Sequence, residues 1–214
     1  MPTVTLPEQT GNSCAAHCTV VAIQELLTKP GLTKGFAEGN FWDTIKFRPS
    51  ATEGPITTEL ANKNNSDPRR IVSEIAKRWP GVTARLLFDD TQKTAGLLNV
   101  PGAHPNLAVN YQLALAGLYN LLKGTAGAIT IDPQNGRYYN CSYLMYNAST
   151  PNAMAFAGMH NILVANQSNL IWYYNSNETT PVWQQTTAWK RLDNQNGGNH
   201  SYIFTGVCVE VGRS

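Results

Sequence analysis

The sequence is poor in charged residues. Asp, Glu, Lys and Arg make up only 14% of its 214 residues, against about a quarter in an average globular protein, and Asn, Thr, Ser and Gln take much of their place. This composition favours a β-rich chain with many loops and argues against a coiled coil. The net charge of +2 is too small to indicate a polyanionic partner, so no nucleic-acid binding is expected.

Long hydrophobic runs are also missing. No apolar stretch approaches the roughly 20 residues that a membrane-spanning helix needs, so no membrane partner is expected. The opening MPTVTLPEQTG has neither a basic start nor an apolar core, which excludes a Sec signal peptide at this position. We therefore expect a protein that stays in the cytoplasm or is secreted without a Sec signal, by an effector-type export route.

Cysteine is scarce, and its pattern demands neither a disulfide nor a metal. The four cysteines are at 14, 18, 141 and 208, and a bridge between Cys14 and Cys18, four residues apart on a helix, would be strained. Cys14, His17 and Cys18 form C-x-x-H-C, but structural zinc normally uses a second ligand pair that is absent here. We expect no metal and no cofactor, and interpret Cys208 as a buried core thiol.

Helical patterns come early and strand patterns late. A helix is expected from Ser13, as capping residue, to about Leu27, and a second follows Asp67-Pro68. A strand at 82–89, a helix at 106–122 and a strand at 126–132 are predicted between these and the last third. That last third contains three strand-like runs, at 159–166, 169–175 and 200–212, and the first two read as an antiparallel hairpin. This order predicts a single α+β domain, residues 1–214, with helices packed on an antiparallel sheet.

The stretch QTGNSCAAHC at residues 9–18 places Cys14 at the start of the first helix. The helix dipole and the free backbone N–H groups favour a thiolate there, with a pKa below the usual value of about 8.5. The same N–H groups and the side-chain amide of Gln9 could line an oxyanion hole. The alternative interpretation is that Cys14 is a small hydrophobic residue that begins a core helix.

A catalytic thiol needs a base, and four histidines are available. His17 is a helical neighbour with a poor angle for proton transfer, and His104 lies in a proline-flanked loop. His160 and His200 each open a strand-like run. The hairpin after His160 returns the chain so that Asn175 can fix the imidazole, which makes His160 the preferred base.

In its motifs the chain resembles the papain-like cysteine peptidases. QTGNSC at a helix start, GMHNILVA and LIWYYN are similar to the compact bacterial branch, which comprises bacteriocin-processing peptidase domains and papain-fold effectors and toxins. The resemblance implies a papain-like α+β fold, with Gln9 as oxyanion donor, Cys14 as nucleophile, His160 as general base and acid, and Asn175 as orienting residue. It also implies a protein or peptide substrate and, for a toxin, a partner immunity or inhibitor protein.

Several points stay open at this level. Ala15 follows the cysteine where the bacterial branch usually has glycine, and Asn177 competes with Asn175 as orienting residue. Residues 31–105, where specificity would be built, match no motif. A deamidase, an acyltransferase or a peptidoglycan amidase could use the same residues. A non-catalytic binding module is the other alternative, based on the late aromatic residues Trp172, Tyr173, Tyr174, Trp183 and Trp189. Our prediction is a thiol-dependent hydrolase that cleaves an amide bond, in an effector or toxin.

Overall fold

The computed structural model describes residues 1–28, 31–50, 61–62, 64–89, 122, 130–148 and 154–214. His104 and nearly all of the helix expected at 106–122 lie outside these residues. So does most of the strand expected at 126–132, and residues 130–132 do not form a strand. Among the described residues, no helix is long and apolar enough to cross a membrane.

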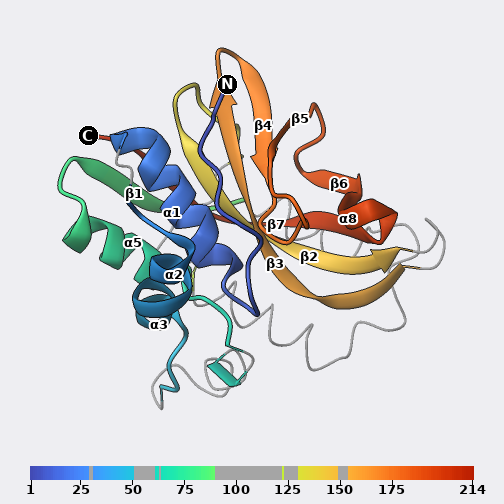
Figure 1. Cartoon of the computed structure of the whole chain (residues 1–214), viewed down its shortest axis with the longest axis horizontal. Coiled ribbons are helices and arrows are strands. Elements are labelled where there is room, and N and C mark those ends of the chain that lie inside the picture. The colour runs from blue at the N-terminus through green and yellow to red at the C-terminus, as the bar shows by residue number, and fades with distance from the viewer. Residues whose placement is uncertain (29–30, 51–60, 63, 90–121, 123–129, 149–153) are drawn as a thin grey trace.

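The fold is α+β, with helices in the first half of the chain and an antiparallel sheet that dominates the second half (Figure 1). The helical elements are α1 (Cys14–Leu27), α2 (Lys34–Phe36), the π-helical turn η1 (Ala37–Phe41), α3 (Trp42–Ile45), α5 (Pro68–Arg78) and α8 (Gln195–Gly198). The strands are β1 (Val82–Phe88), β2 (Tyr138–Ala148), β3 (Met154–Gln167), β4 (Leu170–Tyr174), β5 (Trp183–Gln185), β6 (Arg191–Asn194) and β7 (His200–Arg213). The sheet runs in the order β1-β7-β2-β3-β4-β5, and β6 pairs with β7.

Helix α1 begins and ends where the sequence predicts, but its start is capped differently. Ser13 occupies the N-cap position, yet its side chain makes no capping bond and its Oγ donates to the Thr10 carbonyl at 3.0 Å. The predicted side-chain cap is therefore wrong, and the first N–H groups of α1 are not used by Ser13. The helix ends at Leu27, and its C-cap residue, Thr28, adopts a left-handed conformation with φ of 51°.

The second predicted helix is confirmed in its details. Asp67 is the N-cap of α5, its side chain accepts the Arg69 N–H at 2.9 Å, and Pro68 occupies the first turn. Proline is tolerated there because the first N–H groups of a helix have no partner within the helix. This helix packs beside β1, which also lies where the sequence places it.

The predicted hairpin is β3 and β4, which pair from Leu163↔Tyr174 to Gln167↔Leu170. Two predictions for this part of the sheet are wrong. His160 lies in the middle of β3 rather than at its start, because the strand begins six residues earlier, at Met154. Strand β2, which pairs with both β3 and β7, was not predicted.

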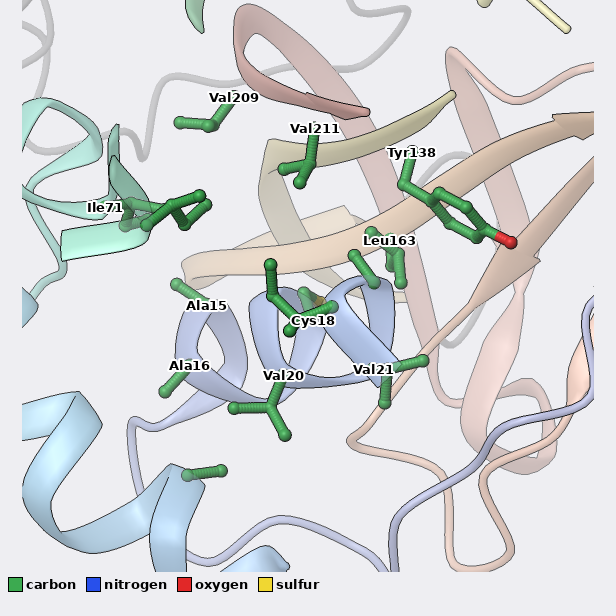
Figure 2. Close-up of a cluster of buried hydrophobic side chains, with 14 of the residues drawn as sticks. Ala15, Ala16, Cys18, Val20, Val21, Ile71, Tyr138, Leu163, Val209 and Val211 are labelled. Carbon is green, nitrogen blue, oxygen red and sulfur yellow. The ribbon is translucent and has the colours of Figure 1, made fainter. Parts of the chain in front are cut away.

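Two layers of buried side chains lie against the sheet, and the first of them also contains the buried residues of the helices. In the first, Figure 2 shows α1 packed under the sheet, with Leu163 and Val211 of the strands above Cys18 and Val21 of the helix. The second lies on the opposite face of the sheet and is rich in tyrosine. All four cysteines are buried and unbridged, so the prediction for Cys208 is confirmed. Helix α1 is thus fixed against β3, which sets the position of its first residue.

Candidate active site

Cys14, the first residue of α1, lies against the edge of β3 just before the pairing of β3 with β4 begins. Strand β4 pairs with β3 only from Leu163 onward. At Asn161, just before that point, the backbone N–H donates to Cys14 Sγ at 3.3 Å. The fold therefore brings the predicted nucleophile against the residue that directly follows the predicted base, although 147 positions separate Cys14 from Asn161 in the sequence.

His160 and Asn175 are hydrogen-bonded, as the hairpin argument predicts. His160 Nε2 lies 2.8 Å from Asn175 Oδ1, and both side chains are buried. Asn175 directly follows β4, so the return strand of the hairpin carries it to the histidine. The alternative orienting residue, Asn177, contributes its backbone N–H instead, which donates to Asn175 Oδ1 at 3.1 Å.

The surroundings of Asn175 determine which imidazole nitrogen carries the proton. Asn175 Oδ1 accepts the backbone N–H of Asn177, and its Nδ2 donates to the Glu178 carboxylate at 3.2 Å. Since one partner can only donate and the other only accept, the amide has one orientation. The atom facing His160 is therefore the oxygen. The neutral imidazole must donate from Nε2, which leaves the lone pair on Nδ1.

A tyrosine that the sequence analysis missed packs on the imidazole. The Tyr202 ring of β7 lies 5.2 Å from the His160 ring, at an interplanar angle of 39°. The His200 ring, on the same strand, also stacks with the Tyr202 ring, and the two ring centroids are 6.2 Å apart. Burial raises the pKa of Tyr202, and the interaction with Cys14 adds to this shift, so the tyrosine lies near both the thiol and the histidine. The only sequence signal was the alternation of His200 and Tyr202 along one strand.

Burial controls the protonation of both reactive groups. It raises the pKa of the Cys14 thiol to about 11, although backbone N–H groups of Asn161, Ala15 and Cys14 itself oppose the shift. The prediction that the helix start lowers this pKa is therefore wrong, because desolvation outweighs the helix terminus. Burial also lowers the pKa of His160 to about 4, more than the hydrogen bond to Asn175 raises it. At neutral pH the site holds a neutral thiol and a neutral imidazole.

Gln9 is joined to the site through Ser176. Its backbone N–H donates to the Ser176 carbonyl at 2.9 Å, and its Oε1 accepts from Ser176 Oγ at 2.6 Å. The side-chain Nε2 donates to the Gly11 carbonyl at 2.9 Å. Gln9 is thus held beside the residue that follows Asn175, but its amide donor is engaged with Gly11. Its role as oxyanion donor stays a prediction.

His17 anchors the segment that leads to Cys14. The imidazole is completely buried, and its Nε2 lies 3.1 Å from Glu38 Oε1. Glu38 also accepts from the backbone N–H and the hydroxyl of Thr10, at 2.6 and 3.1 Å. This network fixes the chain just before α1. Within the described part of the chain, no group of three or more Cys, His, Asp or Glu residues is placed to hold a metal ion.

Two asparagines complete the surroundings of the thiol and were also missed. Asn161 Oδ1 faces Cys14 Sγ at 3.9 Å, and Asn161 Nδ2 donates to Asn140 Oδ1 at 2.9 Å. The sequence offered one signal, the position of Asn161 directly after His160.

The late aromatic residues mostly pack the sheet. Tyr173, Tyr174 and Trp189 are buried, and the Tyr174 hydroxyl donates to the Leu6 carbonyl at 3.0 Å. A groove of about 770 Å³ lies elsewhere, between residues 5–10, Lys34 and residues 179–181, and Gln9 is part of its lining. Its volume falls in the range of small-molecule and peptide sites.

No family model matches the chain, and no curated protein is similar to it in sequence.

Proposed function

We propose that this protein is a thiol-dependent hydrolase that cleaves an amide bond in a protein or peptide, with Cys14, His160 and Asn175 as its catalytic group. The observation that carries the proposal is the oriented His160–Asn175 pair. Its hydrogen bond at 2.8 Å leaves Nδ1 as the basic nitrogen, on the strand residue next to the one that binds the Cys14 sulfur. A nucleophile, a base and a group that orients the base are the three parts that such chemistry requires.

The first step is attack on the substrate carbonyl. Because Cys14 and His160 are both neutral at rest, the thiol proton moves to His160 Nδ1 as the Cys14 Sγ–carbon bond forms. The backbone N–H groups at the start of α1 are available for the negative charge that develops on the carbonyl oxygen. Gln9 would join them after its Nε2 leaves the Gly11 carbonyl.

The second step restores the enzyme. His160 gives the proton to the departing amine, which leaves an acyl group on Cys14 as a thioester. Water then attacks the thioester carbonyl and loses its proton to His160, and the thiol is released. Asn175 keeps Nδ1 available throughout, because it accepts a hydrogen bond from Nε2–H in both the neutral and the protonated imidazole. The cycle needs no cofactor.

The substrate is proposed to lie along the groove beside Gln9. This groove holds apolar Leu6 and Pro181 together with Lys34 and Glu8, a mixture that suits a peptide better than a purely apolar ligand. The papain-like assignment, the effector or toxin role, export without a Sec signal and a partner immunity or inhibitor protein are part of the same proposal. They rest on the motif resemblance of QTGNSC, GMHNILVA and LIWYYN.

The proposal is tested with a peptide library and mass spectrometry. Wild type is incubated under reducing conditions, and the products are searched for new termini, for deamidated glutamine and for acyl transfer to an added amine. Hydrolysis is expected in wild type and in Cys208→Ala, a variant of a buried thiol in the sheet. Cys14→Ala and His160→Ala are expected to be inactive. Activity that survives Cys14→Ala would contradict the proposal.

A further inference from the structure

Two asparagine side chains form a chain of hydrogen bonds that ends at the Cys14 sulfur. It begins at Asn140 in β2, whose Nδ2 donates to the Ala15 carbonyl at 2.8 Å and to Thr19 Oγ1 at 2.9 Å. A carbonyl oxygen can only accept, so the Asn140 amide has one orientation. Its oxygen therefore points away from α1, toward β3.

The orientation of Asn140 fixes that of Asn161. Asn161 Nδ2 donates to Asn140 Oδ1 at 2.9 Å and lies 3.4 Å from Ser142 Oγ. With its nitrogen engaged in this way, Asn161 turns its oxygen to Cys14, where Oδ1 lies 3.9 Å from Sγ. The same residue donates its backbone N–H to that sulfur at 3.3 Å. Asn161 thus offers the thiol one donor and one acceptor.

The donor and the acceptor favour different protonation states of the sulfur. A backbone N–H stabilises a thiolate, as at any site where an anion meets a donor. An amide oxygen can accept the S–H hydrogen but repels a negative charge on sulfur, so it favours the neutral thiol. Asn140 decides which protonation state of the sulfur the Asn161 side chain favours. Without Asn140, the Asn161 amide could rotate and present its NH₂ group to the sulfur.

We infer that Asn161, held in place by Asn140, is a positioning residue that keeps Cys14 at the β3 edge as a neutral thiol. The role of this contact in catalysis rests on the proposed function. The S–H hydrogen must leave Asn161 Oδ1 and turn to His160 Nδ1 before the sulfur can attack. The resting protein is consequently slow to react with soft electrophiles, and an arriving acyl substrate has to trigger the transfer.

The test is the rate at which iodoacetamide alkylates Cys14 in the full chain between pH 6 and pH 10, measured by peptide mass spectrometry. Asn161→Ala removes the acceptor and keeps the backbone N–H. Alkylation at pH 7.5 is then expected to be about threefold faster, because the S–H group is a weak donor and its contact with Asn161 Oδ1 is long, at 3.9 Å. Asn140→Ala frees the Asn161 amide, and a similar increase is expected.

Two further variants separate this effect from general loosening of the site. Asn161→Asp keeps an acceptor toward the sulfur, so its alkylation should be as slow as in wild type or slower. If Asn161→Ala does not fold, Asn140→Ala decides the question, because the inference requires faster alkylation of Cys14 in that variant. Asn166→Ala is the matched control. It removes an asparagine of the same strand whose Nδ2 donates to the Pro133 carbonyl, and it should leave the alkylation of Cys14 unchanged.

The inference is overturned if Asn161→Ala alkylates at the wild-type rate, or if Asn161→Asp is accelerated as much as Asn161→Ala. Neither result depends on catalysis, since the readout is the reactivity of one thiol. Conversely, hydrolysis that persists in Cys14→Ala would contradict the proposed function. The alkylation rates of Cys14 would still test the role of Asn161. The two proposals can therefore fail separately.

Discussion

Gln9 and Ser176 exchange two hydrogen bonds. The backbone N–H of Gln9 donates to the Ser176 carbonyl, and Ser176 Oγ donates to Gln9 Oε1 at 2.6 Å. The pair links the segment that enters α1 with the residue that follows Asn175. Any movement of one shifts the other, so the proposed oxyanion donor and the proposed orienting amide are positioned together.

The first prediction compares Asn175 with its neighbour Asn177. Asn175→Ala removes the acceptor of His160 Nε2, and kcat/KM for the hydrolysed peptide should fall by about 100-fold, the cost of a misplaced catalytic group. Asn177→Ala keeps the backbone N–H that binds Asn175 and should stay within about threefold of wild type. Steady-state kinetics decide between them. Equal losses in the two variants would show that Asn175 has no special role.

The second prediction concerns stability and pH. His160 is protonated near pH 6.5 in the unfolded chain, but burial lowers its pKa to about 4 in the folded protein. Between pH 6.5 and pH 4 the unfolded state therefore binds more protons than the folded state. The contribution of His160 to the free energy of unfolding is complete above pH 6.5 and is lost as the pH falls toward 4. The expected loss from this group is about 3 kcal/mol. Urea unfolding at pH 7 and pH 4 measures it.

A variant isolates the contribution of His160 to that loss. His160→Gln cannot be protonated, so its unfolding free energy should change less between pH 7 and pH 4 than that of wild type. His200→Gln removes a histidine that also stacks on Tyr202, and serves as control. The assignment fails if the two variants lose stability with pH to the same extent.

The third prediction is the pH dependence of activity. The base must be neutral to accept the thiol proton, and the pKa of His160 is about 4. In the free enzyme, kcat/KM should rise with pH through about 4 and stay level at neutral pH. A site that rests as a thiolate–imidazolium pair would instead lose activity as its imidazolium deprotonates near neutral pH. A descending limb at that point would contradict the neutral resting state.

The fourth prediction tests the groove beside Gln9. Thr180→Trp places a large ring in its lining and should raise KM for the peptide about tenfold while kcat changes less than twofold, the pattern of lost binding without lost chemistry. Thr187→Trp, an exposed position outside this lining, is the control. Unchanged KM in Thr180→Trp would mean that the substrate lies elsewhere.

Local sequence signals were sufficient for several parts of this molecule. Asp67-Pro68 and the pattern after it defined α5, because capping and proline act within one turn. The hairpin length placed Asn175 beside His160, because strand pairing converts sequence distance into position.

Other features depend on tertiary packing, which a single sequence does not display. The helix start suggested a thiolate at Cys14, but the sheet that covers the thiol raises its pKa. Asn161 and Asn140 look like ordinary strand residues until β2, β3 and α1 meet. Tyr202 reaches His160 from a strand 42 positions further along the chain, at a ring separation of 5.2 Å.

The place of β7 in the sheet has a consequence for how the protein folds. This strand comes last in chain order, yet it lies between β1 and β2, so the sheet cannot close until the most distant segment inserts into its interior. Such long-range pairing is slow, because chain entropy is lost before the contacts form. A growing or interrupted chain that lacks residues 200–213 would have neither Tyr202 over His160 nor the join between the two halves of the sheet. The packing of Tyr202 on the His160 ring is therefore complete only after β7 has inserted into the sheet.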